Sequence, residues 1–115
     1  GYTYAEMGIK LDEAERLVQE ALSLEPDNGY FIDSLAWIYY RSERYEEARE
    51  QLKKAVSLVS NDAVILEHYG LVLERLGEKE EAIRSLERAL ELAPESDDTN
   101  AKRRIEQAIK RLSEN

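Results

Sequence analysis

The chain has 115 residues, of which 36% are charged and 43% hydrophobic, and its formal net charge is −9 at pH 7. Two Pro, five Gly and no Cys fit a single helix-rich domain and exclude disulfides and thiolate metal sites. No apolar run reaches the roughly 18 residues that span a membrane, and the negative charge argues against nucleic acid and anionic membranes as main partners.

The first unit, residues 1–28, is predicted to hold helical segments over 1–7 and 11–24. Gly8 marks the turn between them, and Ala14 and Ala21 share one face of the second segment. By alignment with the later units, the chain begins partway into a first helix. We therefore expect a fragment of a longer repeat protein. We also expect self-association through its truncated N-terminal face.

The second unit, residues 29–62, is predicted to form helices over 29–42 and 45–58. Both helices carry an apolar face at the 3.6-residue spacing. Ala48 and Ala55 follow the two alanines of the first unit by 34 residues.

The third unit, residues 63–96, repeats the plan with helices over 63–76 and 79–92. Ala82 and Ala89 continue the 34-residue register. Asn61 or Asp62 suits the N-cap of the first helix, and Gly77 suits its end. Pro94 is expected to stop the second helix.

Residues 97–115 are predicted to form one last helix over 98–113. Its apolar residues make a single narrow stripe. A helix with one apolar face and one polar face suits the open end of a repeat array. The stripe consists of Ala101, Ile105, Ala108, Ile109 and Leu112.

Small residues in a fixed 34-residue register are the signature of stacked helical repeats. The pattern resembles the tetratricopeptide repeat (TPR), whose unit is two antiparallel helices. The departures are Ser60 in place of a closing Pro, and Val18 in place of a bulkier residue. The matching residues are Gly1, Tyr4, Ala14, Ala21, Pro26, Leu35, Ala36, Tyr39, Tyr45, Ala48, Leu52, Ala55, Tyr69, Gly70, Ala82, Leu86, Ala89 and Pro94.

The resemblance implies an all-α fold, a right-handed α-solenoid of stacked antiparallel hairpins with a C-terminal capping helix. The chain also resembles the C-terminal repeats of long bacterial TPR proteins. Some of those are outer-membrane lipoproteins that act as adaptors for periplasmic proteases. The compartment stays open between the bacterial cytoplasm and the periplasm or outer membrane.

In the TPR family the first helix of each hairpin lines a concave groove. Helical periodicity selects the side chains that face it, and aromatic anchors with charged rims are typical of binding surfaces. The alternative is that Trp37 and Tyr40 pack against each other or against a missing helix. The predicted groove residues are Tyr30, Asp33, Trp37, Tyr40, Arg41, Val64, Glu67, Leu71, Glu74 and Arg75.

The charges of these residues bear on the partner. Asp33, Glu67 and Glu74 favour protein segments with Lys or Arg. The Lys, Arg and Asn with which some family members hold a C-terminal carboxylate are missing, because Asp33, Trp37, Glu67 and Leu71 occupy that face.

Two function classes remain open. The first is a protein–protein interaction scaffold or adaptor that binds a peptide or helical segment of a partner in the groove. The second is a structural capping or self-association segment of a longer TPR array.

An enzyme is not expected, and neither is a cofactor or metal. His68 has no second His or Cys to complete a metal site, and it is interpreted as a partly buried, satisfied side chain. The basic run at residues 102–104 is interpreted as a solvated face.

Overall fold

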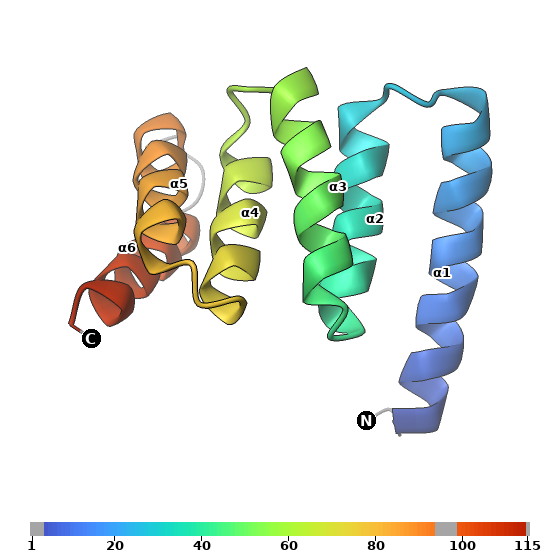
Figure 1. The fold of residues 1–115 in the computed structure, drawn as a ribbon, viewed down its shortest axis with the longest axis horizontal. Coiled ribbons are helices and arrows are strands. Elements are labelled where there is room, and N and C mark those ends of the chain that lie inside the picture. Colours follow the sequence, from blue (N-terminus) through green and yellow to red (C-terminus); the bar gives the residue numbers. More distant parts are fainter. Residues whose placement is uncertain (1–3, 94–98, 115) are drawn as a thin grey trace.

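The computed structural model describes residues 4–93 and 99–114, with side chains from Lys10 onward except that of Thr99. These residues contain helices and no strand, so the all-α prediction is confirmed. Figure 1 shows the helices arrayed in chain order. From α2 onward, each begins and ends within one residue of its predicted range. They are α1 Tyr4–Leu24, α2 Gly29–Arg41, α3 Tyr45–Leu58, α4 Ala63–Arg75, α5 Lys79–Leu92 and α6 Thr99–Ser113.

The prediction of two segments within the first unit is wrong. The single helix α1 runs through Gly8 without a break. A lone Gly inside a helix costs only about 1 kcal/mol relative to Ala, whereas an isolated helix of seven residues does not hold together in water. Continuing the helix is therefore less costly than forming a turn at Gly8.

Small residues bring the two helices of each hairpin close together. A Cβ atom added at Gly70 of α4 would lie 2.6 Å from Cγ of Leu86 on α5. Ala36 of α2 takes the equivalent position in the hairpin of α2 and α3, and it is fully buried. The recurrence of small residues at this position therefore reflects backbones that approach too closely for a larger side chain.

The ends of α2 and α4 follow the same local chemistry. The side chains of Asn28 and Asp62 accept hydrogen bonds from backbone N–H groups of the first turns, as N-caps do. Beyond the C-terminal ends, Gly77 has φ 79° and Glu43, 34 residues earlier, has φ 61°. Both turns therefore use the left-handed conformation, although only one has Gly there. The stop predicted at Pro94 lies outside the described residues.

The core divides into two clusters along the array. The first joins α2 and α3 to the start of α4, and the second joins α4, α5 and α6. The predicted stripe of α6 is part of the second cluster, where Ile105, Ala108 and Leu112 are buried. α6 thus covers the apolar face that α4 and α5 leave at the end of the array.

The first helices of the hairpins lie on one side of the array together with α6. α2 contacts α4, and α4 contacts α6, whereas α3 and α5 do not contact each other. The side formed by α2, α4 and α6 is therefore the inner one. Within the described ranges, no helix combines the length and apolar character needed to cross a membrane.

Candidate binding groove

Two adjoining cavities lie between α2, α4 and α6 on the inner side, with volumes of about 560 and 260 Å³. Leu71 of α4 lines both, so together they form one open groove. Six of the predicted groove residues line them: Trp37, Tyr40, Glu67, Leu71, Glu74 and Arg75. Three more that were not predicted also line them: His68, Arg104 and Arg111.

The other four predicted residues lie around these cavities. The side chain of Asp33 is bonded to that of His68. Val64 is exposed and helps to line a third cavity of about 240 Å³ beside α6. Tyr30 and Arg41 are exposed and line none of these three cavities.

A stack of three rings runs along the groove. The Trp37 ring lies between those of Tyr40 and His68, with centroid distances of 4.5 and 4.0 Å and interplanar angles of 10° and 19°. Tyr40 also meets the edge of the Tyr45 ring. Trp37 and Tyr40 therefore do pack against each other, as the alternative interpretation held, yet both stay partly exposed and line the cavities. Rings that are already held in place lose little side-chain freedom on binding.

A hydrogen bond ties His68 of α4 to Asp33 of α2. The His68 Nδ1 atom lies 2.8 Å from Oδ1 of Asp33, and both side chains are mostly buried. An ionised carboxylate can only accept, so the ring must carry a proton on Nδ1. This bond holds the His68 ring in the orientation that stacks on Trp37. The interpretation of His68 as a partly buried, satisfied side chain agrees with this geometry.

Two arginines of α6 hold two carboxylates of α4. The Arg104 guanidinium donates to both carboxylate oxygens of Glu67, which is only 5% exposed. One heptad further along, Arg111 donates to both oxygens of Glu74, at 2.6 and 2.7 Å. Such two-pronged pairs fix direction as well as distance. They therefore position α6 as the third wall of the groove, and the hydrogen bond to Glu74 raises the pKa of Arg111.

These contacts remove the basis for the predicted basic partner. That preference rested on Asp33, Glu67 and Glu74, and each of these carboxylates already receives a hydrogen bond from a side chain of this chain. The basic run at residues 102–104 is not wholly a solvated face either, because Arg104 belongs to the groove.

Arg75 differs from the other arginines of the groove. Its side chain is hydrogen-bonded to Tyr40, which raises the pKa of the guanidinium, and it lies 5.9 Å from the ring centroid of Tyr45. It makes no ion pair with a carboxylate among the described residues. Its positive charge therefore faces the larger cavity without a bound counter-charge from the described part of the chain.

The sequence did carry one signal for the residues that were missed. Arg104 and Arg111 each lie 37 residues after their carboxylate partner, and both lie off the apolar stripe of α6. Their equal offset would have suggested pairing if the register of α6 had been known. His68 follows Glu67 and faces Trp37, which helical periodicity alone does not reveal.

Comparisons with known proteins agree with this architecture. A family profile described as tetratricopeptide repeat matches residues 10–63 and again residues 34–97. A TPR repeat-containing protein of Pseudomonas aeruginosa is 36% identical over 52 residues, which are 45% of this chain and 9% of that protein. The match thus covers under a tenth of the length of that curated relative.

Two solved structures show the same fold. The type III secretion translocator chaperone SycD of Yersinia enterocolitica has a TM-score of 0.84 at 18% identity, covering 93% of this chain and 74% of that one. The first TPR domain of Spaghetti (RPAP3), bound to the HSP90 peptide SRMEEVD, has a TM-score of 0.77 at 25% identity, covering 96% and 85%. With the family match over most of its length, this chain belongs to the tetratricopeptide repeat family.

Proposed function

We propose that this chain is a protein-interaction scaffold that binds a segment of a partner along the groove between α2, α4 and α6. The observation that carries the proposal is the ring stack of Tyr40, Trp37 and His68, which lines two adjoining cavities. Partly exposed aromatic rings over an open groove are a common anchor for protein segments. No group of three or more His, Cys, Asp or Glu in the described part of the chain could hold a metal.

The family comparison supports a peptide-sized ligand. The RPAP3 domain, which covers most of this chain, was solved with a bound peptide. A bound C-terminal carboxylate is not expected here, because the inner face carries Asp33, Trp37, Glu67 and Leu71 where that mode uses Lys, Arg and Asn. The ligand of this groove is therefore an internal stretch of a partner, held by its side chains.

Peptide selection followed by substitution of Trp37 tests the proposal. Random linear peptides displayed on phage are selected on the chain, and the enriched peptides are synthesised and titrated by calorimetry. Trp37→Ala should weaken binding by about 2 kcal/mol or more, as the loss of a central aromatic anchor does. Circular dichroism of the variant checks that its helices are intact.

Leu58→Ala serves as the matched control, because it also removes an exposed apolar side chain but lies on α3, away from the groove. It should leave the affinity unchanged. Leu71→Ser, at the residue that joins the two cavities, gives a second variant in case Trp37→Ala unfolds. If selected peptides bind both groove variants as tightly as the parent chain, the groove proposal is wrong.

Self-association is a second candidate function, and it rests on α1. Leu17 and Leu24 lie seven residues apart on this helix and are 60% and 84% exposed. Ser85, at the position in α5 equivalent to Leu17, is buried and donates to the backbone carbonyl of Leu66 in α4. The Leu17 side of α1 is therefore the side on which a first helix packs in the later hairpin.

A second copy of the chain would bury these leucines in solution. Sedimentation velocity over a range of concentrations tests this. Association that Leu17→Lys abolishes supports the candidate, and a chain that stays monomeric at high concentration refutes it.

A further inference from the structure

The larger cavity of the groove has an excess of positive charge. It is lined by Tyr40, Leu71, Glu74, Arg75 and Arg111. Glu74 and Arg111 are bonded to each other through both carboxylate oxygens, so their charges offset one another locally. Arg75 adds a positive charge that no described carboxylate pairs with. A ligand in this cavity therefore meets one uncompensated guanidinium.

The same cavity also has apolar walls. Leu71 forms one of them, and the Tyr40 ring, held in the stack with Trp37, forms another. The volume of about 560 Å³ lies within the range of pockets that hold small ligands. It therefore has room for an apolar side chain of a partner together with the neighbouring residue.

On these observations we propose that the groove takes a segment in which an acidic residue neighbours an apolar or aromatic one. The apolar side chain packs on Leu71 and Tyr40, and the carboxylate pairs with Arg75. This inference deepens the proposed function and rests on it. It names the opposite charge from the one that the sequence alone predicts.

A basic segment fits this cavity poorly. A Lys side chain would approach two guanidiniums, and the Glu74 oxygens that could receive it already accept bonds from Arg111. Desolvating a like charge beside a guanidinium is unfavourable. The contacts within the chain thus select against the partner that the residue types alone suggest.

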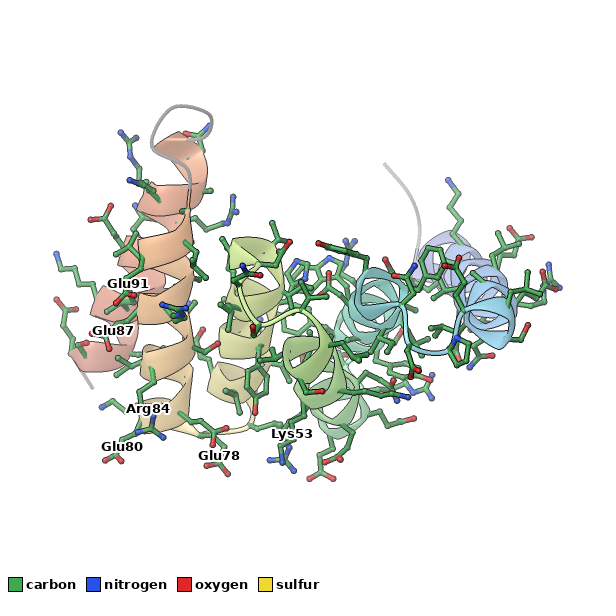
Figure 2. All side chains as sticks on the ribbon, turned by 90° about the horizontal axis from the view of Figure 1, so that it is seen from above. Lys53, Glu78, Glu80, Arg84, Glu87 and Glu91 are labelled. Carbon is green, nitrogen blue, oxygen red and sulfur yellow. The ribbon has the colours of Figure 1, made fainter. Side chains whose placement is uncertain are left out.

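The overall charge of −9 does not oppose this inference at short range. Electrostatic interactions between exposed charges are largely screened beyond about 8 Å at physiological salt. Acidic side chains also lie elsewhere on the surface. Figure 2 shows Glu78 and Glu80 along an outer edge on the side of α3 and α5, close to Lys53. The local charge at Arg75 therefore decides which side chain the cavity prefers.

The selected peptides also test this inference. We expect them to be enriched in Asp or Glu next to Leu or an aromatic residue. Arg75→Gln should raise their Kd about fivefold, as expected for loss of a partly exposed ion pair. Changing the peptide's acidic residue to its amide should cause the same loss. The two changes together should cause no further loss, because they remove one interaction.

Arg84→Gln is the control for Arg75→Gln, since it removes the same charge from α5, outside the groove. It should leave the Kd unchanged. If the peptides depend on Trp37 but are rich in Lys and Arg, or do not respond to Arg75→Gln, the groove proposal stands and the acidic preference is overturned. A selection that yields no peptide dependent on Trp37 overturns both.

Discussion

The turn after α2 stores backbone strain that one substitution should release. Glu43 has φ 61°, in the left-handed region, at the place where the turn after α4 has Gly77. The two turns close with the same hydrogen bonds. The Arg44 N–H donates to the Tyr39 carbonyl at 2.8 Å, and its equivalent in the α4 turn, 34 residues later, is 2.9 Å long. Glu43→Gly should therefore keep the turn and remove the strain.

The size of the gain follows from two opposing terms. A residue with a Cβ costs about 1–2 kcal/mol in the left-handed conformation. A Gly in its place loses about 0.4–1 kcal/mol more in chain entropy on folding. The difference predicts that Glu43→Gly raises the free energy of unfolding by about 0.5–1 kcal/mol. By the same reasoning Gly77→Ala should lower it, since a Cβ there meets no atom within 4 Å and only the backbone term acts.

Urea denaturation followed by circular dichroism measures both changes. Glu43→Gln is the control, because it removes the charge at the end of α2 but keeps a Cβ. If Glu43→Gly is no more stable than Glu43→Gln, the gain comes from charge or is absent, and the argument from backbone strain is refuted.

The remaining predictions concern a buried ion pair and an ionisable ring. Arg104→Met should lower the free energy of unfolding in urea by about 2 kcal/mol, because Glu67 would stay buried without its guanidinium. Glu67→Met combined with Arg104→Met should recover most of that loss, and a double variant as unstable as the single one would contradict this account. Burial, and then the nearby Glu81, raises the pKa of Tyr69 to about 12. The folded chain therefore keeps the phenol proton above pH 10, where the unfolded chain releases it, so this contribution is complete below pH 10 and is lost as the pH rises towards 12. Denaturation at a series of alkaline pH values should show this loss, and Tyr69→Phe should remove it; identical profiles for the two chains would count against it.

Repetition explains how much of the fold the sequence predicts. Each helix of the two full hairpins is supported by an equivalent residue in the other unit, so caps such as Asn28 and Asp62 can be placed from their shared register. The first unit has no such support. The Gly at position 8 looked like Gly77, but α4 ends at its Gly because a second helix packs back on it, and α1 has no such partner among the described residues.

Charge pairing in the groove could not be read from the sequence for a different reason. Helical periodicity places Glu67 and Glu74 on the inner face but does not show what lies opposite them. That depends on the register of α6, which follows a segment outside the 34-residue pattern. The same two residues suggest a basic partner when viewed alone and an occupied pair when α6 is in place.

The role of α6 makes capping and binding one question and not two. The apolar stripe of this helix packs against α4 and α5 and closes the core. Its other side sends Arg104 and Arg111 into the groove, one heptad apart. A helix that served only to cover the array would need the stripe alone, because any polar residue suffices on the solvent side. Deleting α6 would therefore expose the core and open the groove at once, and its result could not assign either role. Substitutions on the groove side that leave the stripe intact, at Arg75 and Trp37, separate binding from stability.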